Sequence, residues 1–119
     1  MCSITINKTA DDILARQSEK DRRMIERRLV QFAQDASVSV KGALDTIAPM
    51  TRMSGDLKQA RKKTIGRHRV YYTGFHTQCS YRAFFVKPFK KAGVDDEDDP
   101  RFQNTLFRAM DDREYRELA

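Results

Sequence analysis

The residues of this sequence that are best suited to chemistry are the lysines and arginines between positions 52 and 91. This segment contains eleven Lys or Arg residues and one acidic residue, Asp56, whereas residues 92–119 contain four basic and nine acidic residues. A compact block of positive charge produces a potential of several kT near its surface. The charge pattern therefore predicts that residues 52–91 bind something acidic.

The spacing of these cations follows the two-residue period of β-strands. We expect Arg61 and Lys63 to share one face of a strand, and Arg67 and Arg69 to share one face of the next. Lys90 and Lys91 are expected to close a third strand, so that the cations of the three strands collect on one concave surface. The interleaved aromatic residues are Tyr71, Tyr72, Phe84 and Phe85. Cations neutralise phosphates and aromatic rings stack on unpaired bases, which favours single-stranded RNA as the ligand. The alternative is that Lys and Arg on exposed strands only prevent edge-to-edge aggregation.

Other kinds of site are not indicated. The sequence has no phosphate-binding loop, no dinucleotide-binding glycine pattern, no HExxH, no CxxC and no nucleophile elbow. His68, His76 and Cys79 are the one cluster with metal-ligand chemistry. The favoured interpretation is that the two histidines alternate on one strand face and Cys79 packs, so we expect no metal and no cofactor.

The length of 119 residues predicts a single domain over 1–119. Alternation predicts a first strand at Ser3–Asn7, and Thr9 is expected to begin a short helix. Ser18 is a candidate N-cap for a helix of about 18 residues, since apolar residues then recur at helical spacing. This stripe consists of Ile25, Leu29, Phe32, Ala33 and Ala36. A further helix is expected over Val38–Ile47, ended by Pro49. This helix and the one that Ser18 caps are expected to form an antiparallel hairpin that lies on a sheet.

The segment after Pro49 is expected to form a basic β-meander within residues 52–91. Its predicted strands are 57–65, 67–75 and 79–89, with a type II′ turn at Ile65–His68 and a bulge near Gly74. Residues 95–99 are expected to form an acidic loop, and residues 100–117 a helix capped by Asp99. The order β-α-α-β-β-β-α predicts an α+β fold with an antiparallel sheet.

The cysteines and the hydropathy suggest a compartment. Cys2 and Cys79 lie far apart in the sequence, and we expect free thiols in a reduced, cytoplasmic protein. No apolar run approaches the ~20 residues that span a bilayer, so no membrane association is expected.

The sequence contains an ordered set of short motifs. They are Lys8-Thr9-Ala10, Gly55-Asp56-Leu57, Gly66-x-x-Arg69-Val70-Tyr71-Tyr72 and Phe84-Phe85-Val86-x-x-Phe89-Lys90-Lys91, followed by a Pro-started helix. This set resembles the RelE/ParE superfamily of bacterial toxins, closest to its HigB/RelE-like branch. The resemblance extends from Ile4 to about Ala109. It implies a RelE-like fold and a metal-independent mRNA endoribonuclease, an mRNA interferase, that acts on ribosome-bound mRNA.

The resemblance also implies roles for particular residues. The catalytic residues by position are Arg61, Lys63, Arg69 and Lys91, and the RNA-binding residues are Lys62, Arg67, Tyr72 and Lys90. Arg61 departs from the pattern, because a lysine is usual there and arginine hardly gives up its proton.

The resemblance further implies a partner, an acidic antitoxin that neutralises the toxin in a hetero-oligomer. The alternative function is that of a ParE-like toxin, which cuts no RNA and inhibits a protein target such as DNA gyrase.

Overall fold

The structure is a computed structural model, and it describes residues 2–38, 48–49, 60–75, 79–88 and 99–118. Several predictions fall outside these ranges: the helix over 39–47, the sites at Lys90 and Lys91, His76, and most of the acidic loop 95–99.

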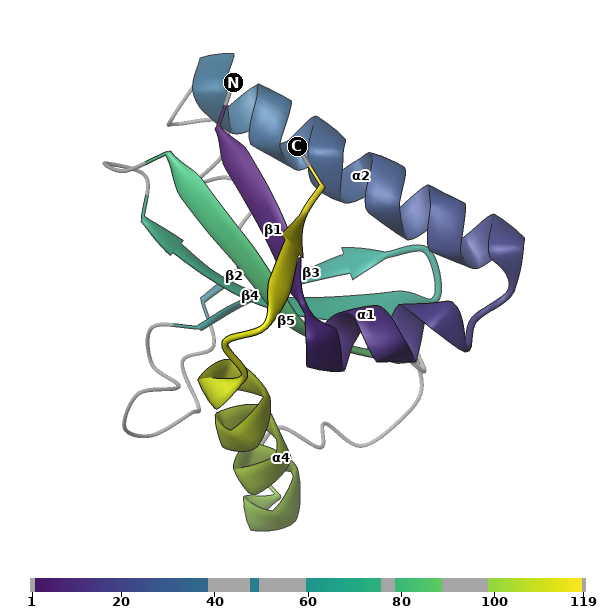
Figure 1. The fold of residues 1–119 in the computed structure, drawn as a ribbon, viewed down its shortest axis with the longest axis vertical. Helices are drawn as coiled ribbons and strands as arrows, with labels where there is room; N and C mark the ends of the chain where they lie inside the picture. The colour runs from purple at the N-terminus through teal and green to yellow at the C-terminus, as the bar shows by residue number, and fades with distance from the viewer. Residues whose placement is uncertain (1, 39–47, 50–59, 76–78, 89–98, 119) are drawn as a thin grey trace.

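The described residues form an α+β fold built on one sheet (Figure 1). The sheet has the strand order β2-β3-β4-β5-β1-β6. The elements are β1 (Ser3–Asn7), α1 (Lys8–Ala15), α2 (Glu19–Val38), β2 (Ala48–Pro49), β3 (Arg61–Ile65), β4 (His68–Phe75), β5 (Ser80–Pro88), α4 (Pro100–Asp111) and β6 (Tyr115–Glu117).

The sheet is mixed, so the prediction of a purely antiparallel sheet is wrong. The first strand, β1, is inserted between β5 and β6, and it runs parallel to β5 with Ile4 opposite Tyr81. The meander β3-β4-β5 is antiparallel as predicted.

The C-terminal helix is shorter than the predicted 100–117. It begins as predicted, with the Asp99 side chain accepting a hydrogen bond from Arg101 N and with Pro100 in the first turn. It ends at Asp111 because Asp112 adopts an extended backbone and its carboxylate accepts hydrogen bonds from the Thr9 amide (2.8 Å) and hydroxyl (2.7 Å). The chain then turns back to form β6 beside β1.

The helices before the meander follow their local signals. Ser18 caps α2, since its hydroxyl accepts a hydrogen bond from Asp21 N at 3.2 Å. The predicted apolar stripe is buried at Ile25, Leu29, Phe32 and Ala33. The predicted start of α1 is displaced, because the N-cap is Asn7 and not Thr9.

The turn between β3 and β4 has the predicted type. Ile65 lies opposite His68, and Gly66 has a φ of +58° while Arg67 does not have positive φ. Positive φ at the first central residue alone is the property of a type II′ turn.

The bulge lies elsewhere than predicted. Tyr71 pairs with Phe85 and Tyr72 with Ala83, so Phe84 is the extra residue, and Gly74 pairs regularly with Tyr81. Gly74 has a different role: a Cβ there would lie 2.8 Å from the carbonyl oxygen of Ser80 and against the Tyr81 ring.

The two faces of the sheet are covered differently. We call the face under α1 and α2 the α2 face and the opposite one, on which α4 packs, the α4 face (Figure 1). The α2 face supplies the larger core, which consists of Cys2, Ile4, Ile6, Ala10, Leu14, Ile25, Leu29, Phe32, Ala33, Ile65, Val70, Tyr72, Tyr81, Ala83 and Val86. The α4 face supplies a smaller one, with Ala60, Tyr71, Phe84, Leu106 and Ala109.

The two cysteines form a disulfide, so the expectation of free thiols is wrong for this structure. The parallel pairing of β1 with β5 puts Ser3 opposite Ser80, which brings the preceding residues, Cys2 and Cys79, to a Cα–Cα distance of 4.6 Å. Their separation of 77 positions in the chain conceals this proximity in the sequence.

Candidate nucleic-acid interface

Three cations from three adjacent strands share the α4 face. In the meander, Lys62 lies opposite Tyr71, and Arg69 lies directly opposite Lys87. Paired residues of neighbouring strands point to the same side, and Tyr71 packs beneath α4. Lys87 Nζ lies 4.4 Å from the ring centroid of Phe102 in α4, which confirms the side on which it lies. We call Lys62, Arg69 and Lys87 the cation row; all three side chains are partly buried.

The distances within the cation row suit a phosphate group. Cβ atoms of directly opposed residues lie about 5 Å apart, as for Arg69 and Lys87. Diagonal neighbours such as Lys62 and Arg69 lie roughly 7–8 Å apart, within reach of two long side chains. One phosphate above Arg69 is therefore within reach of all three.

The aromatic residues that we expected to stack on bases mostly pack inside the protein. Tyr71 and Phe84 are buried beneath α4, and the Tyr71 ring centroid lies 5.7 Å from that of Phe102. Phe85 completes this cluster, 5.8 Å from Phe102. Tyr72, predicted to bind RNA, is 1% exposed and lies on the α2 face against Phe32, so its ring is not accessible to a base.

Arg61 and Lys63 do not join Arg69, although the sequence predicted one surface for the three. Arg61 lies opposite Tyr72 and Lys63 opposite Val70, so both side chains project from the α2 face. Arg61 and Lys63 share a face of β3 as predicted, but Arg67 lies in the turn before β4, and the register of the hairpin puts Arg69 opposite Thr64 and thus on the side of Lys62.

The surroundings of Lys63 are distinct. Its Nζ lies 5.6 Å from the ring centroid of Phe32, and with Arg28, Gln31 and Asp35 it lines a cavity of about 320 Å³ between β3 and α2. Burial lowers the pKa of Lys63, the nearby Arg28 lowers it further, and Asp35 acts in the opposite direction. This lysine is perturbed, but it lies on the face opposite to the cation row.

The remaining predicted residues are placed as follows. Arg67 is exposed in the β3–β4 turn. His68 is 5% exposed, and its Nε2 lies 2.9 Å from Gln17 Oε1, which makes it a residue of the interior. Within the described ranges, no group of three or more His, Cys, Asp or Glu side chains is arranged to hold a metal ion.

The sequence prediction missed Arg82, Lys87 and Tyr115. Lys87 follows from the hairpin register once the β4–β5 pairing is known, and its partner is Arg69. Arg82 lies on the same face, opposite Thr73 and beside Thr5 of β1. No sequence signal indicated Tyr115, because the strand that carries it, β6, was predicted as helix.

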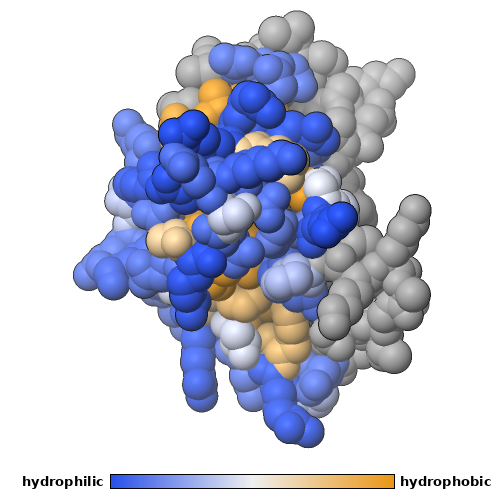
Figure 2. Space-filling model, turned by 90° about the vertical axis from the view of Figure 1, so that its right-hand side faces the viewer, coloured by the Kyte–Doolittle hydropathy of each residue, from blue (hydrophilic) through white to orange (hydrophobic). Residues whose placement is uncertain are grey.

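The side of the molecule drawn in Figure 2 is largely polar over the described residues. Figure 2 shows hydrophilic side chains over most of one side, with apolar side chains only in small patches. Among the helices in the described ranges, none has the length and apolar character that a membrane-spanning segment needs.

Comparison of the chain with protein-family models, with curated proteins and with solved structures finds no match.

Proposed function

We propose that the protein is the toxin of a type II toxin–antitoxin pair, with a RelE-like fold and metal-independent endoribonuclease activity on mRNA. The observation that carries the proposal is the cation row, in which Lys62, Arg69 and Lys87 come together from three adjacent strands. The motif resemblance adds the expectation that the substrate is mRNA on the ribosome in the cytoplasm.

The proposed reaction is attack of a ribose 2′-hydroxyl on the adjacent phosphate. It forms a 2′,3′-cyclic phosphate, breaks the bond to the 5′-oxygen and needs no oxidant or metal. The transition state needs a proton acceptor, a proton donor and cations for the added charge on phosphorus.

The central position of Arg69 in the row fits the phosphate itself. A guanidinium presents a planar fork of donors that binds two phosphate oxygens at once. Arginine keeps its proton, whereas lysine can exchange one. Lys62 and Lys87, on either side of Arg69, are therefore the proposed groups for accepting the 2′-proton and donating to the leaving 5′-oxygen.

The proposed partner is an acidic antitoxin. Its acidic segment would cover the cation row and compete with RNA for the same charges. Such segments are commonly disordered alone and fold on binding.

The adjacent residues Lys62 and Lys63 provide a matched test, because their side chains lie on opposite faces of β3. An unstructured RNA is incubated with the purified protein in EDTA, and with a translating extract, and the 5′ ends and cyclic phosphates are mapped. We expect Lys62→Gln and Arg69→Gln to reduce cleavage about 100-fold or more, as loss of a transition-state donor does. Lys63→Gln should leave cleavage within a few-fold of the wild type.

Equal losses in Lys62→Gln and Lys63→Gln would remove the cation row as the site. Intact RNA in both assays, with growth arrest and blocked gyrase in cells, would replace the nuclease proposal by the ParE-like one. Far-ultraviolet circular dichroism of each variant shows whether a loss of activity comes from unfolding.

A further inference from the structure

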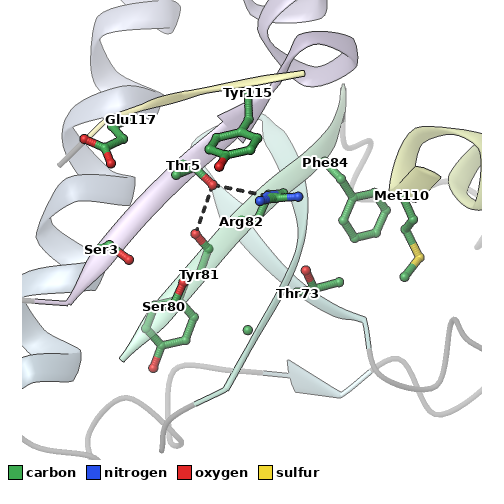
Figure 3. Close-up of a pocket in the computed structure, with 11 residues that line it drawn as sticks. Ser3, Thr5, Thr73, Ser80, Tyr81, Arg82, Phe84, Met110, Tyr115 and Glu117 are labelled. Carbon is green, nitrogen blue, oxygen red and sulfur yellow. Dashed lines mark hydrogen bonds between the residues drawn. The ribbon is translucent and has the colours of Figure 1, made fainter. Parts of the chain in front are cut away.

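A second feature of the α4 face is a cavity of about 360 Å³ around Arg82, at the end of the sheet where β5, β1 and β6 adjoin (Figure 3). We call it the Arg82 pocket. Its volume lies within the range of small-ligand sites. The residues that give it its chemistry are Thr5, Arg82, Phe84, Met110, Tyr115 and Glu117.

Arg82 is held in place by contacts that leave its charge inside the pocket. Its Nε donates a hydrogen bond to Thr5 Oγ1 at 3.4 Å, and its guanidinium carbon lies 4.2 Å from the ring centroid of Tyr115. Thr5 Oγ1 in turn donates to the carbonyl oxygen of Tyr81 at 3.4 Å. Since neither Thr5 nor Tyr115 is anionic, these contacts orient the guanidinium without neutralising it.

Tyr115 is the other unusual residue of the pocket. It is 54% exposed, and it is the one large hydrophobic side chain in the described ranges that lies open to solvent. Alternation in β6 directs Tyr115 and Glu117 to the α4 face, while Arg116 projects to the α2 side. Arg116 is paired there with Asp11 (2.8 Å) and Glu26 (2.6 Å), which fastens β6 to α1 and α2. An exposed aromatic ring held on a fixed strand suits stacking with a planar group.

The ends of the pocket differ in chemistry. Phe84 and Met110 form an apolar end, Glu117 lies at the other, and Arg82 lies between them (Figure 3). The Glu117 carboxylate repels a second anionic group, so a ligand with one negative charge at Arg82 and a planar apolar part fits best. A nucleotide unit of single-stranded RNA has this composition, with one phosphate and one base.

We propose that the Arg82 pocket binds one nucleotide of single-stranded RNA, with the phosphate on Arg82 and the base against Tyr115. This inference rests on the proposed function, and it adds a subsite away from the cation row. Arg82 and Lys87 are five residues apart on β5, roughly 16 Å along the strand. A strand of RNA on the α4 face thus spans several nucleotides between the cation row and the pocket.

The test uses adenosine 5′-monophosphate, adenosine and inorganic phosphate as probes, with binding followed by two-dimensional NMR of the full chain. We expect the nucleotide to bind more tightly than either part alone. Arg82→Gln should weaken nucleotide binding about tenfold or more, as loss of a charge-assisted hydrogen bond does. Tyr115→Leu, at an exposed position, should weaken nucleotide binding several-fold and phosphate binding less, because the ring stacks on the base and only orients Arg82 for the phosphate. Arg22→Gln is the control, since it removes an equal charge from an exposed position on α2.

Each outcome is decisive for the pocket. Equal binding of phosphate and nucleotide, or equal effects of Arg82→Gln and Arg22→Gln, overturns the proposal. Binding of an acidic peptide that depends on Arg82, without binding of the nucleotide, assigns the pocket to a protein partner and also overturns it.

The RNA assay separates this inference from the proposed function. A raised KM with unchanged kcat in Arg82→Gln supports the subsite. Cleavage with unchanged KM refutes the subsite and leaves the nuclease intact. Nucleotide binding that depends on Arg82 in a protein that cleaves no RNA supports the subsite and refutes the nuclease.

Discussion

Asn7 connects two parts of the fold, and its replacement by alanine is the most direct test of how α4 is held. The side chain is fully buried between β1 and α1. Its Oδ1 accepts a hydrogen bond from Ala10 N at 3.0 Å, as the N-cap of α1. Its Nδ2 donates to the carbonyl oxygen of Ala109 at 2.7 Å, near the end of α4.

The two hydrogen bonds contribute separately to stability. Loss of an N-cap side chain costs about 1 kcal/mol. The Ala109 carbonyl keeps a hydrogen bond from Asp112 N at 3.2 Å, so it is not left unsatisfied, and loss of the Asn7 bond costs about 1 kcal/mol more. Asn7→Ala should therefore lower the free energy of unfolding by about 2 kcal/mol.

Urea denaturation followed by far-ultraviolet circular dichroism measures this difference. Ser18→Ala is the matched control, because Ser18 caps α2 with one exposed hydrogen bond and its side chain makes no hydrogen bond to another element within the described residues. We expect the control to lose about 1 kcal/mol or less, with the same m-value. If Asn7→Ala costs no more than Ser18→Ala, the bond to Ala109 does not stabilise the fold and the reasoning is refuted.

Three other predictions concern the core and the charge. The Cys2–Cys79 disulfide links residues 77 positions apart, so its reduction should lower the free energy of unfolding by roughly 4–5 kcal/mol through the added chain entropy of the unfolded state. The Cys2→Ser/Cys79→Ser variant is the control, because reductant should not change its stability. An unchanged urea midpoint on reduction of the wild type would contradict the prediction. The Tyr72 hydroxyl is buried with no hydrogen-bond partner in the described residues, so Tyr72→Phe should be neutral or stabilising by up to about 1 kcal/mol at pH 7. Burial raises the pKa of Tyr72 above its usual value, so the unfolded state ionises first and the wild type should lose stability as the pH rises above about 10. An equally steep loss in Tyr72→Phe would rule Tyr72 out as the source of this pH dependence. RNA that contacts the cation row and Arg82 meets four cations. A plot of the logarithm of the RNA-binding constant against the logarithm of salt concentration should therefore have a slope of roughly −3. A slope near zero would exclude phosphate contacts.

Local signals predicted the local structure of this protein well. The stripe from Ile25 to Ala33 identifies α2, because burial of one helix face requires apolar residues at this spacing. Gly66 identifies the hairpin turn, since a residue with a side chain is strained at a φ of +58°. Asp99 and Pro100 mark the start of α4 through chemistry confined to one turn.

Contacts between distant segments were not predictable in the same way. The pairing of β1 with β5, the disulfide and the return of β6 all join residues more than 70 positions apart. β6 is three residues long, with every side chain exposed, so it has no apolar alternation to reveal it. It forms because Asp112 ends α4 and because Arg116 is anchored to Asp11 and Glu26.

The candidate site lies between these two cases. The predicted two-residue turn already determines that Arg69 faces the side of Lys62, because pairing outward from Ile65 and His68 puts Thr64 opposite Arg69. The partner on β5 was not predictable, since the bulge at Phe84 shifts the alternation of that strand by one residue. Lys87 therefore joins the row only in the folded structure.

The cations of residues 52–91 are divided between the two faces of the sheet, so only some of them can contact one ligand. A count of cations in residues 52–91 treats them as one surface, but a phosphate bound on one face of the sheet cannot contact side chains that project from the other face. Arg61 and Lys63 project from the face that α2 covers, where Lys63 lies near Asp35 and over the ring of Phe32. Lys62, Arg69, Arg82 and Lys87 project to the α4 face. If the ligand is RNA as proposed, the charge that faces it is smaller than the sequence suggests, and its arrangement matters more. On this proposal the cation row serves one phosphate, and Arg82, farther along β5 beside the exposed ring of Tyr115, serves another nucleotide of the same strand.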